Sequence, residues 1–183
     1  MAGTKILILL VATGLFSSLV PAQTNLSTRF SFLDLPEEEI PVAYQSDALN
    51  DNPLLDGYDV KFYGLNLEAT NRSDEIRGDA TILVQVVDNT LSTLVFELNN
   101  SLQVDRVQVD GEEVEFRHEA NEITLSLAPP RRAGELVSAT VWYGGQTGEG
   151  MVRQVDENWN VPVTYTSTEP FLSLDWFPCK QNL

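Results

Sequence analysis

The run His118-Glu119-Ala120-Asn121-Glu122 has the residue types of a zinc-binding HExxH helix, with glutamate in place of the second histidine. That motif needs both histidines on one face of a helix, so that both can ligate the metal. Here the run lies between alternating apolar and polar stretches at 114–118 and 123–127, a pattern typical of strands. We therefore interpret the run as the turn of a β-hairpin.

The chain holds one histidine, His118, and one cysteine, Cys179. This excludes a two-histidine metal motif, a cysteine-cluster zinc site and an intramolecular disulfide. A single histidine also cannot be assigned a nucleophile from sequence. The glycine-rich residues 144–150 lack the lysine of a phosphate-binding loop, so we interpret them as a flexible connection.

Glu169 is followed by seven residues and then by an aromatic-Pro-Cys triplet at 177–179. Phe171, Trp176 and Phe177 lie close to the end of the sequence, with little chain after them. Large apolar side chains need a surface to pack on. We therefore expect them to be partly exposed unless a further partner covers them.

This spacing resembles a signature of the aminopeptidase N family of zinc metallopeptidases (gluzincins), in which a Gln or Glu precedes an aromatic-Pro-Cys triplet by seven residues. Other segments are similar to the same family, in the family's order. They are residues 52–67, 76–82, 94–98, 104–111 and 141–144. The resemblance covers residues 52–183, which is nearly all of the chain after a predicted signal peptide.

The resemblance implies that the chain is the N-terminal β-saddle domain that precedes a thermolysin-like catalytic domain in the family. At the position matching Glu169, the family's Gln or Glu reaches into the active site and binds the free α-amino group of the substrate. A carboxylate suits this task, because a charge-assisted hydrogen bond to an ammonium group is strong. Phe171, Trp176, Phe177 and Cys179 are then expected to pack the β domain onto the catalytic domain.

The family's catalytic elements do not occur in this sequence: the Gly-x-Met-Glu-Asn loop, the HExxH helix, the third zinc ligand and the transition-state tyrosine. We therefore expect no catalytic residue, metal site or cofactor in this chain, and zinc only in the full-length family. The chain is interpreted as an N-terminal fragment, inactive alone. Its expected partners are the missing catalytic domain and the N-terminus of a peptide substrate.

The alternative is a stand-alone secreted β-sandwich that acts as a binding or adhesion module. The DNA that follows the codon of Leu183 distinguishes the two, because an open frame running into an HExxH helix supports the enzyme fragment.

The charge of the chain narrows the choice of partners. It has 27 acidic residues against 11 lysines and arginines, for a net charge of −16. Nucleic acid and anionic membrane surfaces are both bound through lysine and arginine, so neither is expected as a partner.

Residues 1–22 predict a cleavable signal peptide. Lys5 supplies the positive start, an apolar run begins at Ile6, and small residues before a cut after Ala22 complete the pattern. An uncleaved membrane anchor is the alternative. Cleavage implies a secreted or periplasmic product with no membrane contact beyond the signal peptide. Residues 23–55 are acidic and interrupted by prolines, so we expect them to form an extended leader.

From residue 56 to 183 we expect an all-β domain of antiparallel sheets, in a saddle or sandwich-like arrangement. Seven or eight short alternating runs are separated by turn residues, as in other antiparallel β proteins. They are residues 58–69, 80–86, 94–98, 107–109, 114–118, 123–127, 137–143 and 161–165.

The turn and breaker residues predict where these strands bend and end. The apolar residues of the first run change parity, which predicts a bulge or bend at Tyr63-Gly64. Asp110-Gly111 and Ala120-Asn121 predict tight hairpin turns. Pro129-Pro130 and Gly144-Gly145 are each expected to end a strand.

Overall fold

The computed structural model describes residues 4–11, 52–168 and 171–181 of the chain. Within these residues there are eleven strands and two short 3₁₀ helices, η1 (Pro53–Gly57) and η2 (Ser173–Asp175). All strand pairs are antiparallel. The all-β antiparallel fold that the alternating pattern predicts is therefore confirmed.

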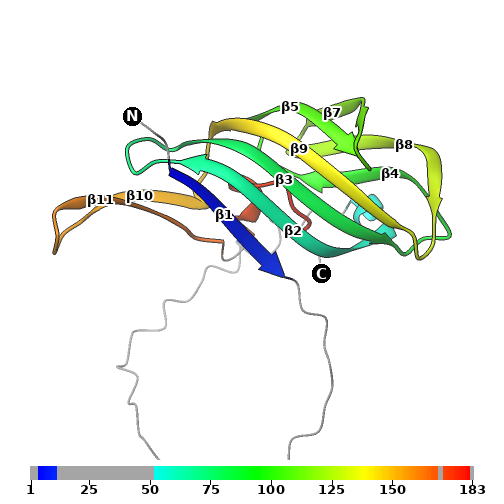
Figure 1. Ribbon diagram of the computed structural model, residues 1–183, viewed down its shortest axis with the longest axis horizontal. Coiled ribbons are helices and arrows are strands. Elements are labelled where there is room, and N and C mark those ends of the chain that lie inside the picture. The colour runs from blue at the N-terminus through cyan, green and yellow to red at the C-terminus, as the bar shows by residue number, and fades with distance from the viewer. Residues whose placement is uncertain (1–3, 12–51, 169–170, 182–183) are drawn as a thin grey trace, which may run out of the picture.

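The strands form three sheets (Figure 1). The largest has six strands in the order β1 (Thr4–Val11), β2 (Tyr58–Ala69), β3 (Glu75–Val86), β9 (Leu136–Gln146), β5 (Leu102–Val109) and β6 (Glu112–Val114). A three-stranded sheet has the order β4 (Thr90–Glu97), β8 (Glu122–Arg132) and β7 (Phe116–Glu119). The remaining pair, β10 (Met151–Asp156) and β11 (Val161–Thr166), forms a ribbon at the end of the domain opposite to β4 and β8 (Figure 1).

The core consists of the inward-facing side chains of the two larger sheets. From Ala80 to Val86 on β3 and from Val137 to Tyr143 on β9, every second residue is buried, as expected for strands with one face on the core. The fully buried side chains, each 0% exposed, include Ala80, Ile82, Val84, Val137, Ala139, Val141, Leu94, Phe96, Ile123 and Leu125. Burial of each large aliphatic side chain contributes about 1.5–3 kcal/mol to folding, so this core holds the two sheets together.

The parity change in the first run is real, but its bulge lies earlier than the sequence predicts. The register between β2 and β3 shifts between Val60 and Phe62, not at Tyr63-Gly64. The shift lets Tyr58 before it and Leu65 after it both face the core, at 1% and 0% exposure. A bulge adds one unpaired residue, so the side chains beyond it change faces.

Both predicted hairpin turns are confirmed by their backbone angles. Asp110 and Gly111 have φ of 51° and 87°, and they join β5 to β6. Ala120 and Asn121 have φ of 52° and 62°, and they join β7 to β8. Positive φ at two consecutive turn residues matches the twist of the strands that the turn connects. The His118–Glu122 run is therefore a hairpin and not a helix.

The prolines do not end their strand as predicted. Strand β8 continues through Pro129-Pro130 to Arg132, and Leu91 and Thr90 of β4 pair with Arg131 and Arg132. The register between β4 and β8 shifts between Leu91 and Thr93, so the prolines lie opposite an irregular part of the ladder. A proline is tolerated where the ladder needs no N–H from it.

The glycine pair does not end its strand either. Strand β9 runs through Gly144-Gly145 to Gln146, between β3 on one side and β5 on the other. A Cβ atom at Gly145, which has φ of 144°, would lie 2.6 Å from the carbonyl oxygen of Ser101. Glycine is thus required here by close backbone approach, and not as a strand terminator.

The N-terminal segment pairs with the edge of the large sheet. Strand β1 runs antiparallel to β2, from Thr4 opposite Ala69 to Val11 opposite Phe62. The expected cut after Ala22 and residues 23–51 of the expected leader lie outside the described residues, and the signal peptide stays a prediction. In the described part of the chain, no helix has the length and apolar character needed to cross a membrane.

Candidate functional site

Glu169, the residue predicted to bind a substrate amine, lies outside the described residues, but the chain on both sides of it is placed. Strand β11 ends at Thr166, and the amide of Ser167 donates to the carbonyl of Gly150 at 2.9 Å. On the other side, the amide of Leu172 donates to the carbonyl of Thr168 at 3.3 Å. The residues before and after position 169 are thus each held by a hydrogen bond, and the role of Glu169 stays a prediction.

The buried carboxylate of Asp175 holds the segment that follows Glu169 to the rest of the domain. Asp175 is 8% exposed. Its Oδ1 atom accepts a hydrogen bond from the side-chain amide of Asn99 at 2.7 Å, and its Oδ2 atom accepts one from the backbone N–H of Gly150 at 3.1 Å. The carbonyl of Asp175 also accepts from the amide of Gly148 at 3.0 Å. One residue thus joins the start of β10, the loop after β4 and the segment that follows Glu169.

The glycines of this region are needed for close packing. A Cβ atom on Gly148 would lie 2.4–2.6 Å from the carboxylate atoms of Asp175. On Gly150 it would lie 2.1 Å from the carbonyl oxygen of Leu172. Carbon and oxygen atoms do not approach so closely, so only glycine fits unless the backbone moves. The interpretation of this stretch as a flexible connection is therefore wrong at Gly148 and Gly150, where it is a packed contact.

Trp176, Phe177 and Cys179 are buried in the domain's own core, at 3%, 5% and 2% exposure. The ring of Phe177 packs edge-on against Tyr63, with 5.6 Å between ring centroids. The hydroxyl of Tyr143 donates to the carbonyl of Trp176 at 3.0 Å. The expectation that Trp176 and Phe177 are left partly exposed is therefore wrong, because the chain supplies their surface itself.

Phe171 differs from these three residues. It is only half-buried, and it has a φ of 61°. Nothing in the described residues tests whether Phe171, Trp176, Phe177 and Cys179 contact a catalytic domain, and that role stays a prediction.

The aromatic-Pro-Cys segment pairs with the end of strand β4. The amide of Glu97 donates to the carbonyl of Cys179 at 2.7 Å, and the amide of Cys179 donates back to Glu97 at 2.9 Å. The side chain of Glu97 accepts from the amide of Gln181 at 2.8 Å. Burial raises the pKa of the Glu97 carboxyl, and the hydrogen bond from Gln181 opposes this rise only in part.

Lys180 ties the end of this segment to strand β2. Its backbone N–H donates to the hydroxyl of Tyr63 at 2.9 Å, and its ammonium group donates to the carbonyl of Tyr58 at 3.0 Å. Burial raises the pKa of both tyrosines, so their hydroxyls stay protonated at neutral pH. The whole stretch from Leu172 to Gln181 is thus fixed by backbone contacts and not only by its apolar side chains.

The described residues do not fit a zinc ion. Within residues 4–11, 52–168 and 171–181, no three His, Cys, Asp or Glu side chains are grouped so that they could hold a metal. The Nε2 atom of His118 lies 3.0 Å from the carbonyl oxygen of Leu98, and burial raises the pKa of the Cys179 thiol. A thiol or an imidazole can ligate zinc only through a thiolate or an unprotonated ring nitrogen. We derive no zinc chemistry from this part of the chain.

Sequence reasoning missed the residues that position the segment after Glu169, namely Asn99, Gly148, Gly150 and Asp175. One signal was available for Asp175, an acidic residue within the otherwise apolar run that ends the chain. A buried carboxylate must find hydrogen-bond donors, but the sequence does not show which donors.

No protein-family model and no curated protein matches this chain. Solved structures do resemble it. A two-domain M1 zinc metallopeptidase, in a mutant form bound to L-tryptophan, is 23% identical with a TM-score of 0.51; the match covers 60% of this chain and 26% of that one. Native leukotriene A4 hydrolase from Saccharomyces cerevisiae is 16% identical with a TM-score of 0.57, covering 69% of this chain and 21% of that one. The yeast enzyme in complex with bestatin is 18% identical with a TM-score of 0.55, covering 68% and 21%.

These similarities show that the chain has the β fold found in these metallopeptidases, as the resemblance implies. The chain spans about a quarter of the length of the M1 metallopeptidase and about a fifth of the yeast hydrolase.

Proposed function

We propose that this chain is the N-terminal, non-catalytic β domain of a longer zinc-dependent aminopeptidase. In this proposal a separate catalytic domain holds the zinc ion, and the β domain helps to recognise the substrate's N-terminus. One observation carries the proposal: the Glu-x₇-aromatic-Pro-Cys spacing of residues 169–179 occurs on a chain with the β fold of M1 metallopeptidases.

The proposed role of Glu169 is to bind the free α-amino group of a peptide. A carboxylate presented from one domain into the active site of the other would pair with an ammonium group in a water-poor pocket, where such a bond is strong. The described contacts support the positioning that this needs. Asp175 holds the segment on one side of position 169, and the bond between Ser167 and Gly150 holds the other side.

We further propose that the protein is secreted or periplasmic, through a signal peptide that is cut after Ala22. Processing there would remove β1 from the edge of β2. N-terminal sequencing of the protein exported by its native host tests this directly, since a mature chain that starts at Met1 or Ala2 contradicts it.

The first test of the enzyme proposal is the gene. The reading frame should continue beyond the codon of Leu183 into a domain with an HExxH helix. A stop codon there, without a frameshift, would instead support a stand-alone secreted binding module.

The second test uses the full-length enzyme. Glu169→Ala should weaken transition-state binding of substrates with a free α-amine by about 2–5 kcal/mol, as expected for loss of one partner of a buried charge pair. Substrates with a blocked amine should be spared. Glu157→Ala is the matched control, because it removes an exposed acid from the turn between β10 and β11. An unchanged kcat/KM in Glu169→Ala would show that Glu169 is only a surface acid.

A further inference from the structure

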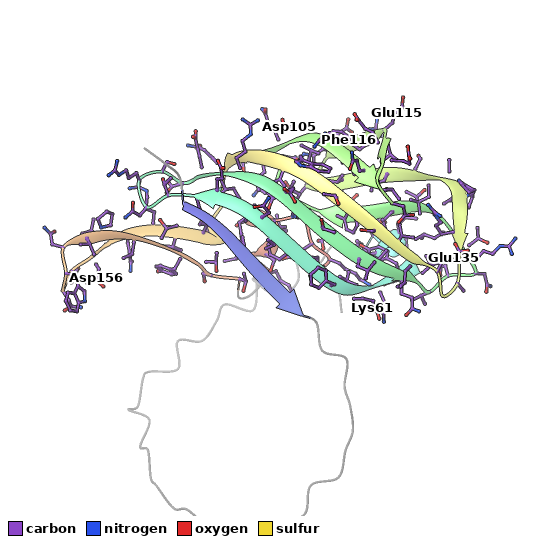
Figure 2. All side chains as sticks on the ribbon, viewed as in Figure 1. Lys61, Asp105, Glu115, Phe116, Glu135 and Asp156 are labelled. Atoms are coloured by element: carbon purple, nitrogen blue, oxygen red, sulfur yellow. The ribbon has the colours of Figure 1, made fainter. Side chains whose placement is uncertain are left out.

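Strand β1 forms one edge of the six-stranded sheet, where it pairs with β2 (Figure 1). Its eight residues follow β2 as far as Phe62. Lys61, the neighbour of Phe62 on β2, marks this end of the ladder (Figure 2). With β1 in place, Leu65 and Leu67 of β2 are 0% and 3% exposed. The outer edge of β2 is therefore a place where the domain accepts a further strand.

The proposed export of the protein removes this strand. Residues 4–11 belong to the predicted signal peptide, and a cut after Ala22 would detach them from the domain. Residues 62–69 of β2 would then present a row of unpaired backbone N–H and C=O groups. An open sheet edge is a template for pairing with other chains, and natural proteins cover such edges. The exported protein therefore needs another cover for β2.

Residues 28–35 repeat the pattern of β1 further along the chain. Their sequence is Thr-Arg-Phe-Ser-Phe-Leu-Asp-Leu, and that of β1 is Thr-Lys-Ile-Leu-Ile-Leu-Leu-Val. Both segments begin with threonine and a cationic residue, and both have apolar residues at the third, fifth, sixth and eighth positions. Pro36, which has no N–H to donate, follows directly and limits the second segment. Residues 28–35 can therefore replace β1 position by position.

The apolar residues of the second segment match the core-facing residues of β2. Residues directly opposite each other in an antiparallel pair share one face of the sheet. In the register of β1, Phe30 takes the place opposite Leu67, and Phe32 takes the place opposite Leu65. Both leucines are buried. The two phenylalanines would thus cover the same side of β2 that faces the core.

The charged residues fit the same register. Arg29 takes the place opposite the exposed Glu68, where β1 has Lys5, and opposite charges on facing residues stabilise a strand pair. Arg29 is also the only basic residue between positions 23 and 60. Asp34, opposite the half-buried Tyr63 near the end of the ladder, is the one residue that fits less well than its counterpart in β1.

We propose that residues 28–35 take the place of β1 at the edge of β2 in the exported protein. This strand exchange rests on the proposed cleavage after Ala22 and needs no catalytic domain. The linker is long enough, because residues 36–51 can span roughly 50 Å at about 3.3 Å per residue. The distance to cover is short, since η1 and the start of β2 follow directly after Asn52.

A second copy of the chain is the rival occupant of the edge. A segment tethered by a short flexible linker has an effective concentration on the order of millimolar, which a free partner rarely reaches. Two chains of net charge −16 also repel each other when their sheets meet. Both effects favour the segment of the same chain.

Trypsin tests the strand exchange at one peptide bond, because a cut after Arg29 reports on residues 28–35 alone. The 183-residue chain is compared before and after signal peptidase removes residues 1–22, and mass spectrometry follows the cut. We expect the Arg29-Phe30 bond to be cut at least tenfold more slowly in the processed chain, since β1 holds the edge before processing. Arg72, exposed between β2 and β3, is the internal control, and its cutting rate should change less than twofold.

A substitution in the segment should remove this protection. Phe32→Ser deletes the apolar side chain opposite Leu65 and leaves the residues on both sides of the Arg29-Phe30 bond unchanged. It should restore rapid cutting in the processed chain. Val42→Ser, a comparable change in the linker, should keep the protection. The same cutting rate in both variants would count against the exchange.

A disulfide tests the register directly. Ser31 takes the place opposite the exposed Asn66. Cβ atoms of directly opposite residues lie about 4.5–5.5 Å apart, close to the reach of a disulfide. Ser31→Cys combined with Asn66→Cys should therefore cross-link most processed chains. Ser46→Cys combined with Asn66→Cys, which uses a linker position, should cross-link less than about a tenth of them.

The outcomes separate this inference from the proposals beside it. A processed chain that is cut after Arg29 as fast as the unprocessed chain, and that forms no disulfide, overturns the strand exchange and keeps the export proposal. A protein that its native host leaves uncut after Ala22 overturns both. Protection of Arg29 that increases with protein concentration, with disulfides between chains, would identify a second copy as the occupant and overturn the exchange within one chain. The enzyme proposal is tested separately, by the gene.

Discussion

The side-chain amide of Asn99 donates a hydrogen bond to the buried carboxylate of Asp175 over 2.7 Å. This contact joins the loop after β4 to the segment that follows Glu169, although the two residues are 76 positions apart in the sequence. The same carboxylate accepts the amide of Gly150 at the start of β10. The placement of the segment that follows Glu169 therefore depends on a residue that contacts no substrate in the proposed function.

Removal of the Asp175 carboxylate should destabilise the domain. In Asp175→Ala, the Asn99 amide and the Gly150 N–H lose their acceptor, and we expect the free energy of unfolding to fall by about 1–3 kcal/mol per donor left unsatisfied. Urea unfolding of the full chain measures this. Asp105→Ala is the matched control, because it removes an exposed aspartate paired with Arg77, and its effect should stay below about 1 kcal/mol. Equal losses of unfolding free energy in the two variants would contradict this role of the Asp175 carboxylate.

Gly148→Ala should be destabilising because of Asp175 itself. The added methyl group would lie 2.4–2.6 Å from the carboxylate of Asp175, which two hydrogen bonds hold in place. The effect should shrink in an Asp175→Ala background, with a coupling free energy of about 0.5–3 kcal/mol in a double-mutant cycle. Glu149→Ala, at the exposed neighbouring position, should have little effect. Additive effects of Gly148→Ala and Asp175→Ala would show that the glycine is needed for another reason.

Glu97→Gln should change how stability depends on pH. Burial raises the pKa of Glu97 in the folded state above its usual value of about 4.3, so the folded protein holds this proton more tightly than the unfolded chain. The stabilising contribution of the protonated group is full below the unfolded pKa and is lost as pH rises through the folded pKa.

Glutamine is uncharged at every pH, and its side-chain oxygen can still accept from the amide of Gln181. The stability of Glu97→Gln relative to the natural chain should therefore increase from about pH 4 to about pH 7. Thermal unfolding across this range, with Glu113→Gln at an exposed site as the control, measures it. If the stability difference between Glu97→Gln and the natural chain stays constant with pH, the prediction is wrong.

The Cys179 thiol should be inert in the folded chain. It is 2% exposed, and burial raises its pKa, so the reactive thiolate is scarce. A thiol reagent should label one cysteine per chain only as the protein unfolds. Val87→Cys places a second thiol at a position that is 58% exposed and provides the control, since that thiol should react at once. Rapid labelling of Cys179 in the natural chain would show that the segment from Leu172 to Gln181 opens readily.

Most strands and two of the hairpin turns could be predicted because their causes are local. Alternation with a period of two on β3 and β9 follows from one buried face, and it is visible in the sequence alone. The turns at Asp110-Gly111 and Ala120-Asn121 depend on the residues that tolerate positive φ. Neither inference depends on which strands lie next to these residues in the sheet.

Strand ends and bulges could not be predicted in the same way. Whether Pro129-Pro130 ends β8 depends on β4, whose register shifts opposite the prolines. Whether Gly144-Gly145 ends β9 depends on β5, whose backbone comes too close for a Cβ atom at Gly145. Both are decided by a partner strand that lies far away in the sequence.

The all-β class, the turns at Asp110-Gly111 and Ala120-Asn121 and the spacing from Glu169 to the Phe177-Pro178-Cys179 triplet can all be read from the chain alone, because each is a pattern of neighbouring residues. What covers that triplet, and what holds the segment from Phe171 to Trp176 before it, depends on contacts with residues far away in the sequence. The donors to Asp175 lie 76 and 25 positions away, and the donor to Glu97 lies 84 positions away. A buried polar group requires a partner, but chain folding alone selects which distant residue supplies it.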